Sequence, residues 1–285
     1  MTKLPTILHS LSPVLLIFAF AAGPLARAQS PADIVRQVVQ NELDADANDH
    51  TSWMYKDAYQ SPDKNIVKIV AETHQGNLSE VVEDHGHPPS AQEHQADLNK
   101  IHQMLTDPSY RARLKQNEQH DGQQARDLLK LLPNAFVWKI DSRENGDVTL
   151  SFHPDPNFSP PSMSAKVLSA MSGIIVVDEQ GMRLKLIDGH LDQPVTFAWG
   201  LLGKIDAGGR FKVVRSEVAP GEWQITQTHV HISGHALFFK NIGDQEDEVT
   251  SDYHRVPNDT TLEKAAEMLQ NGEVAHKLGV EPHFG

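Results

Sequence analysis

Two pairs of histidines have the residue type and the spacing that a metal site could use. His85 and His87 are separated by one residue, as are His229 and His231, so each pair places two imidazoles on one side of an extended strand. A zinc site needs three or four ligands that are held rigidly. The second pair gains no third ligand from its neighbours, so we expect these two histidines at the surface.

The first histidine pair has more potential ligands around it. Asp84 and His94 lie close to it in the sequence, but a glycine and two prolines in the same stretch are typical of a loop. We therefore predict neither a resident metal nor a cofactor. A metal-dependent enzyme that uses His85, His87 and a carboxylate is kept as the second alternative for the function.

Other catalytic signatures are missing from the sequence. Ser172-Gly173 lacks the preceding glycine of a nucleophile elbow, and Ala207-Gly208-Gly209 is typical of a turn between strands rather than of a phosphate loop. The chain has no cysteine, which excludes disulfides, zinc–thiolate sites and a cysteine nucleophile. We predict no catalytic residue and a non-enzymatic protein.

The first 28 residues have the pattern of a secretory signal peptide. Lys3 is followed by a mostly apolar run from Ile7 to Ala22, and Ala26-Arg27-Ala28 gives the small-x-small pattern before cleavage. The apolar run is shorter than the roughly 20 residues of a membrane-spanning helix. We expect residues 29–285 to form a periplasmic or secreted protein with no transmembrane anchor.

The charge of the chain limits its partners. The formal net charge is −13 at pH 7, and it becomes more negative without the leader, which contains two basic residues and no acidic one. Such a charge disfavours nucleic acid and anionic lipid surfaces as partners.

The remaining sequence predicts one β-rich domain over residues 29–285. A helix is expected around 34–43, strands from Trp53 onwards, a helical insertion at about 90–133, further strands from 136 to 256, and a helix from Thr260. Within the insertion, Asp121 is predicted to begin a third helix that ends at Pro133. The fold class is therefore α+β, with a strongly curved antiparallel sheet that forms a half-open barrel under covering helices.

One hairpin has a predicted register. Ser233-Gly234 has the length and composition of a two-residue hairpin loop, which would pair 223–232 with 237–242 and place His229 opposite Phe238.

The order of these elements resembles the lipoprotein-carrier superfamily of the bacterial envelope, with its LolA/LolB-like fold. The resemblance lies in the leader, the N-terminal helix, the segment Met171–Asp178, Trp223 at the start of a strand, and Gly234 before Leu237–Lys240. It implies a half-open antiparallel barrel whose concave face is apolar and holds acyl chains or another hydrophobic partner. The helical insertion and the missing lipobox cysteine depart from that pattern.

The aromatic residues on predicted strands are the candidate ligand-binding residues. If the sheet is half open they line a groove for a hydrophobic or lipid-like ligand, and if it is closed they fill the core. This set comprises Trp138, Phe152, Trp199, Phe211, Trp223 and Phe239. The first alternative function is an envelope protein-interaction or sensing module with a filled core.

Overall fold

The computed structural model describes residues 29–197, 203–236 and 245–270. Its first half consists of α1 (Pro31–Asn48), β1 (Ser52–Ser61), β2 (Lys64–Ala71), β3 (Leu78–Asp84), α2 (Ala91–Thr106), α3 (Pro108–Ala135), β4 (Phe136–Glu144) and β5 (Asp147–Pro154). The second half consists of α4 (Met163–Leu168), β6 (Met171–Asp178), β7 (Arg183–Leu191), β8 (Val195–Phe197), β9 (Gly203–Ile205), β10 (Arg210–Ala219), β11 (Glu222–His231), β12 (Gly234–Ala236), β13 (Gln245–Val256) and α5 (Leu262–Gln270).

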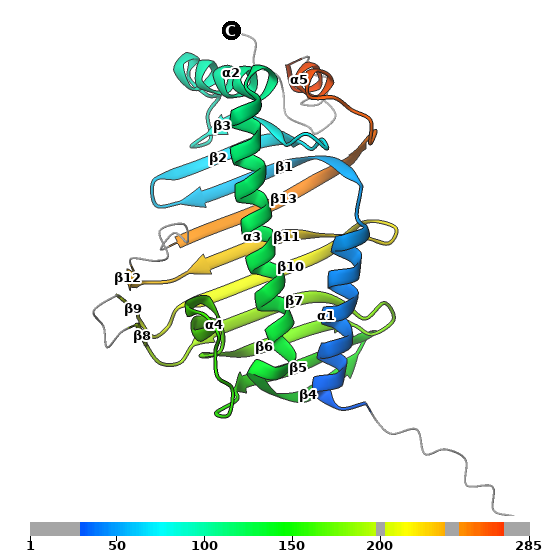
Figure 1. Cartoon of the computed structure of the whole chain (residues 1–285), viewed down its shortest axis with the longest axis vertical. Coiled ribbons are helices and arrows are strands. Elements are labelled where there is room, and N and C mark those ends of the chain that lie inside the picture. Colours follow the sequence, from blue (N-terminus) through cyan, green and yellow to red (C-terminus); the bar gives the residue numbers. More distant parts are fainter. Residues whose placement is uncertain (1–28, 198–202, 237–244, 271–285) are drawn as a thin grey trace, which may run out of the picture.

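A ten-stranded antiparallel sheet forms the centre of the molecule (Figure 1). Its order is β3-β2-β1-β13-β11-β10-β7-β6-β5-β4, so β13 near the end of the described chain lies between β1 and β11. The sheet is not closed, because β3 and β4 are its two edges. A second, three-stranded sheet has the order β12-β9-β8. The predicted α+β class with a large antiparallel sheet is thus confirmed.

One face of the large sheet changes from apolar to polar along its width. Residues that are paired across neighbouring strands share a face. Following the register from β5 to β1 along one row gives Leu150, Ile175, Ile187, Val213, Thr228, Glu248 and Tyr59. The side chains of this row change from apolar to polar between β10 and β11. We call the face of the sheet that carries this row the helix-covered face.

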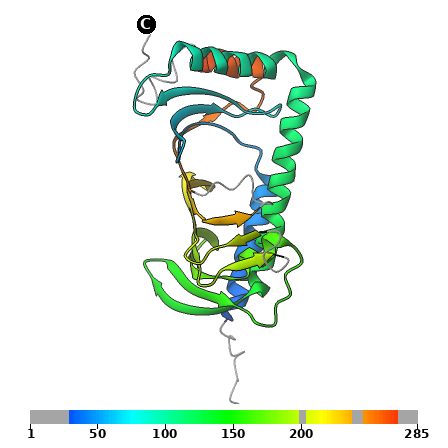
Figure 2. The ribbon, with the colours of Figure 1, turned by 90° about the vertical axis from the view of Figure 1, so that its left-hand side faces the viewer.

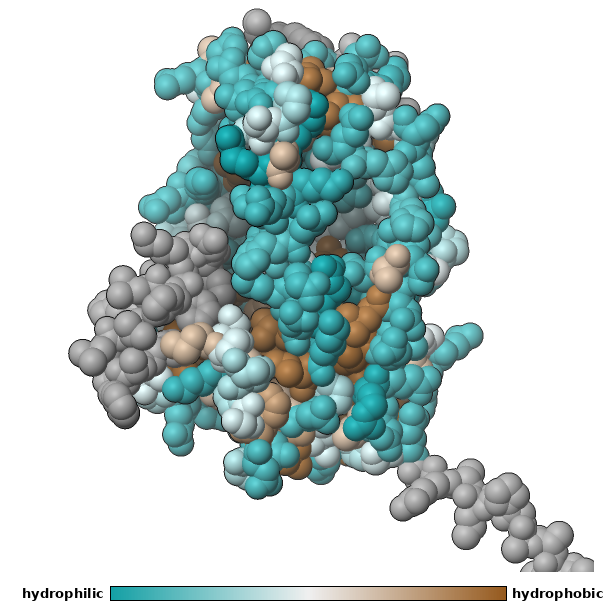
Figure 3. Space-filling model, in the orientation of Figure 1, coloured by the Kyte–Doolittle hydropathy of each residue, from teal (hydrophilic) through white to brown (hydrophobic). Residues whose placement is uncertain are grey.

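The apolar half of this face packs against two helices. Ser30 caps α1 by accepting a hydrogen bond from the backbone N–H of Asp33, and Ile34, Val35 and Val38 are buried on one side of the helix. They share a core with Leu132 near the end of α3 and with buried residues of β4 to β7. Figure 3 shows apolar side chains gathered between α1 and the C-terminal part of α3.

A second apolar cluster lies on the opposite face of the sheet, at the other end. Met54 of β1 and Ala71 of β2 are paired and contact Ile101 of α2 and Leu262 of α5. Because Met54 and Tyr55 are consecutive in an extended strand, Tyr55 points to the helix-covered face. Helices α2 and α3 therefore pack on opposite faces of the sheet, and the chain passes around its β3 edge between them (Figure 2).

Helix α3 joins the two clusters and is exposed in its middle. Seven consecutive residues, 115–121, are all exposed, although a helix lying on a sheet would bury one residue in three or four. The helix runs unbroken from Pro108 to Ala135, so the predicted helix start at Asp121 is wrong. His120 and Gly122, on either side of Asp121, are weak helix formers, so the exposed centre of α3 is stabilised by the packing at both ends of the helix.

The predicted hairpin across Ser233-Gly234 is also wrong. In the structure β11 pairs with β13, so His229 lies opposite Asp247, while β12 pairs with β9 in the smaller sheet. Gly234 has a φ of +150°, and a Cβ atom there would lie 2.2 Å from the carbonyl oxygen of Lys204. This glycine therefore permits close approach of two backbones rather than a two-residue turn. Residues 237–242 lie outside the described part of the chain.

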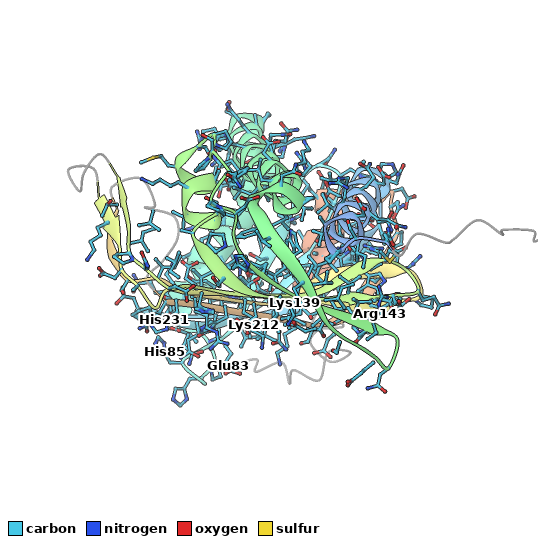
Figure 4. All side chains as sticks on the ribbon, turned by 90° about the horizontal axis from the view of Figure 1, so that it is seen from below. Glu83, His85, Lys139, Arg143, Lys212 and His231 are labelled. Atoms are coloured by element: carbon cyan, nitrogen blue, oxygen red, sulfur yellow. The ribbon has the colours of Figure 1, made fainter. Side chains whose placement is uncertain are left out.

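The other face of the central strands carries charged and polar side chains. Lys139, Lys212 and His231 lie on this side, away from α1 and α3 (Figure 4). Arg210 forms an ion pair with Asp188 of the neighbouring strand β7 at 2.9 Å. Of the described helices, none is long and apolar enough to cross a membrane.

Candidate ligand-binding cavity

A cavity of about 580 Å³ opens on the helix-covered face, where the sheet has become polar. The C-terminal end of α1 forms one side, and β1, β10, β11 and β13 form the floor; Figure 3 shows the surface hollowed between α3 and this end of α1. The lining comprises Ala45, Asp46, Asn48, Asp49, Thr51, Tyr55, Glu72, Arg183, Arg215, Gly221, Glu222, Trp223, Gln224, Ile225, Thr226, Gln227, Thr228, Glu248, Thr250 and Tyr253.

Glu72 is the half-buried carboxylate at the end of β2. One of its carboxylate oxygens accepts a hydrogen bond of 2.9 Å from the backbone N–H of Trp53. Burial raises the pKa of Glu72 to about 7, the Trp53 hydrogen bond opposes the rise, and the charges of Asp49 and Glu118 add to it. Among the ion pairs of the described residues, none involves Glu72. A positive ligand would therefore favour its ionised form.

Glu248 is a second carboxylate in the lining. Burial raises its pKa first, and the neighbouring charge of Asp57 raises it further, whereas Lys68 lowers it. Lys68 is held by Asp57 through an ion pair of 2.7 Å, and the side chain of Asp57 is only 4% exposed. A side-chain hydrogen bond with Asp57 also raises the pKa of Glu248, so the two carboxylates and Lys68 form one interacting group on this side of the cavity.

Three aromatic rings stand beside these carboxylates. Tyr55 stacks on Tyr253 with ring centroids 5.0 Å apart, and Trp53 meets Tyr253 edge-on at 5.8 Å. The Tyr253 hydroxyl donates to Oγ1 of Thr250 at 2.7 Å. Burial raises the pKa of Tyr55 above its ordinary value, and the charge of Glu72 raises it further, so the phenol stays neutral. Tyr55 and Tyr253 thus give the lining a flat apolar surface next to charged groups.

The other end of the cavity contains two arginines that share one carboxylate. Glu42 of α1 is buried and accepts hydrogen bonds from Arg183 at 3.0 and 3.1 Å and from the backbone N–H of Leu184 at 2.8 Å. Arg215 also forms an ion pair with Glu42. Burial lowers the pKa of Arg215, and Glu42 offsets that effect. This triad connects α1 to β7 and β10 and fixes the end of α1 over the cavity.

The structure separates the aromatic residues that the sequence proposed as ligand-binding. Trp138 and Phe152 are buried in the core with ring centroids 5.3 Å apart, and Phe211 packs partly buried against the same core. Trp223 lines the cavity, with the Arg183 guanidinium 5.8 Å from its ring centroid. Trp199 and Phe239 lie outside the described residues.

The histidine pairs gain few additional ligands from the fold. His85 interacts with the neighbouring Asp84 at 2.7 Å, and His94 lies 3.3 Å from Glu80. The ring Nδ1 of His229 contacts the carboxylate of Asp247 on the exposed face. Within the described parts of the chain, no group of three or more histidine, aspartate or glutamate side chains is arranged to hold a metal ion.

Sequence reasoning missed Tyr55, Glu72 and Tyr253. One signal was present: the stretch Gln245–Asp252 is Gln-Glu-Asp-Glu-Val-Thr-Ser-Asp, with a single apolar residue. A central strand of this composition is not covered by a dry core on either face. The stacking of Tyr55 on Tyr253 depends on strand pairing between distant segments, which the sequence pattern did not predict.

Comparisons with protein-family models, with curated proteins and with solved structures find no match to this chain.

Proposed function

We propose that this is a non-enzymatic binding protein whose small ligand occupies the cavity beside the end of α1. The observation that carries the proposal is the exposed middle of α3, residues 115–121, over the polar half of the sheet. Because α3 packs against the protein at both ends and is exposed in its middle, solvent and a small ligand can reach the cavity lining. The cavity volume of about 580 Å³ lies within the range of small-molecule sites.

The lining favours a polar or amphipathic ligand over the acyl chain that the resemblance implies. Seating an acyl chain against Glu72, Asp49 and Glu248 would remove water from carboxylates without replacing it by hydrogen bonds. Threonine hydroxyls and glutamine amides in the same lining offer both donors and acceptors. The kinship with lipoprotein carriers, the half-open barrel shape and the secretory leader stay predictions.

Native mass spectrometry of the purified protein, with organic extraction of the same sample, tests the proposal. We expect a bound small molecule in the wild type that is lost when Thr228→Phe fills the floor of the cavity. The matched control is Thr149→Phe, which adds the same ring on the opposite face of the sheet. A ligand that persists in Thr228→Phe lies elsewhere, and an extracted lipid would favour the hydrophobic ligand instead.

The two alternatives predict different results. A protein-interaction module would bind a basic partner in a salt-sensitive way and leave the cavity empty. A metal-dependent enzyme would purify with stoichiometric metal that is lost on His87→Ala. Absence of any small molecule from both the mass spectra and the extract would contradict the proposed function and direct the search to the exposed sheet face.

A further inference from the structure

We infer that the cavity recognises an organic cation, an ammonium group carried on a small organic body. This inference rests on the proposed binding function and specifies the class of ligand. Three features of the cavity carry it: the carboxylates that face it, the fixed arginines, and the aromatic wall.

The first feature is the distribution of charge among the acidic side chains. Five carboxylates line the cavity, and two of these, Asp46 and Glu222, form ion pairs with arginines outside the lining. Asp49 accepts hydrogen bonds from the backbone N–H of Thr51 and the side chain of Gln224, which are uncharged. Asp49, Glu72 and Glu248 have no arginine partner among the described ion pairs, so this side of the cavity is acidic and a bound cation would favour the ionised forms of these groups.

The second feature is that the basic side chains of the lining are already engaged. Arg183 and Arg215 both bind Glu42, and Arg215 also donates to the backbone carbonyl of Trp223 at 2.9 Å. An anionic ligand would have to compete with Glu42 for these donors, whereas a cation meets carboxylates that no arginine holds.

The third feature is the stacked pair Tyr55 and Tyr253 beside Glu72. The faces of aromatic rings attract cations, and the attraction grows when water is excluded. Glu72 contributes a charge next to the two phenols, as its effects on the pKa of both tyrosines indicate. A carboxylate beside aromatic rings is a combination that suits alkylammonium ions, because they present both charge and apolar surface.

Inorganic cations fit the cavity less well. The described residues contain no cluster of three carboxylates or histidines that could coordinate a metal ion. A neutral polyol could use the same hydroxyl and amide groups. Comparing a charged probe with an uncharged probe of the same shape distinguishes a polyol site from a cation site.

Choline and its uncharged carbon isostere, 3,3-dimethylbutan-1-ol, are the probes. They have nearly the same shape and differ in charge, so a difference in affinity reports the charge alone. We expect isothermal titration to show choline binding at least about tenfold more tightly than the isostere. Glu72→Gln should lower the choline affinity about fivefold or more, while Glu83→Gln, a matched change of an exposed carboxylate on edge strand β3 (Figure 4), should leave it unchanged.

The pH dependence gives an independent readout, because choline itself does not titrate. The groups that face Glu72 are Asp49 after α1, Glu118 of α3, Tyr55 of β1 and Tyr253 of β13. The choline affinity should rise as the pH is raised through about 7, the region in which Glu72 ionises. Glu72→Gln should flatten this rise.

Each contrary result has a defined meaning. Equal binding of choline and the isostere would overturn the cation inference and leave the proposed binding function intact. If neither probe binds although native mass spectrometry shows a ligand that Thr228→Phe removes, the cation inference is also overturned and the proposed binding function is left intact. Choline binding that Glu72→Gln does not weaken would place the cation at another site and also overturn the inference.

Discussion

Tyr55 and Tyr253 stack with an angle of 22° between their ring planes, although 198 positions separate them in the chain. The contact depends on an irregularity in β13, where the register with β1 shifts between Met54 and Lys56. Asp252 lies in this bulge with a φ of +56°. The extra residue turns Tyr253 towards Tyr55, so a backbone feature builds the aromatic wall of the cavity.

The bulge predicts different effects for two substitutions at Asp252. Asp252→Val places a β-branched residue in the left-handed region and should lower the free energy of unfolding by about 1–3 kcal/mol. Asp252→Gly removes the strain and should be neutral or slightly stabilising. Urea unfolding gives the energies, and near-ultraviolet circular dichroism reports the tyrosine stack. If Asp252→Val changed neither the free energy of unfolding nor the tyrosine signal, the proposed role of the bulge in building the aromatic wall would be contradicted.

The ion triad around Glu42 predicts a large loss of stability when the carboxylate is removed. Glu42→Ala leaves Arg183 and Arg215 near the core without their shared partner, and we expect a loss of about 3–5 kcal/mol in chemical denaturation. The control is Asp33→Ala, which removes a carboxylate from the exposed part of the same helix, where its pair with Arg36 contributes little. Similar losses of stability in Glu42→Ala and Asp33→Ala would show that the triad stabilises the fold no more than an exposed ion pair does.

The raised pKa of Glu72 predicts how stability changes with pH. Between the ordinary pKa of 4.5 and about 7, the folded protein keeps a proton on Glu72 that the unfolded chain has released. Stability should therefore fall as the pH rises through this window, by up to about 3 kcal/mol. Comparing wild type with Glu72→Gln by thermal unfolding across the window isolates this group, and a difference that does not vary with pH would contradict the assignment.

Two tryptophans should respond differently to truncation. Trp138→Ala removes a buried ring and its hydrogen bond to the carbonyl of Leu132, so it should cost about 3–5 kcal/mol of stability. Trp223→Ala removes a half-buried ring from the cavity lining, so it should cost less and should weaken ligand binding. Urea unfolding and titration of each variant separate the two effects. An equal loss of stability would mean that Trp223 belongs to the core.

Local signals in the sequence account for much of the secondary structure. Ser90 and Glu93 form a capping box at the start of α2, and Asn145-Gly146 turns between β4 and β5 with positive φ at both residues. These features depend on residues close together in the chain, so a single sequence is sufficient to predict them.

The cavity depends on relationships that the sequence does not encode locally. The pairing of β13 with both β1 and β11 brings Tyr253 to Tyr55 and Glu248 to the floor, and it joins segments nearly 200 residues apart. Helical periodicity predicted where the insertion lies, but the exposure of residues 115–121 follows from packing at the two ends of α3. The sequence by itself determined the class of fold and the regions that form strands and helices, because alternation and turn chemistry are local. Only the tertiary structure decided which aromatic residues fill the core and which carboxylates face a cavity, because burial depends on strand order.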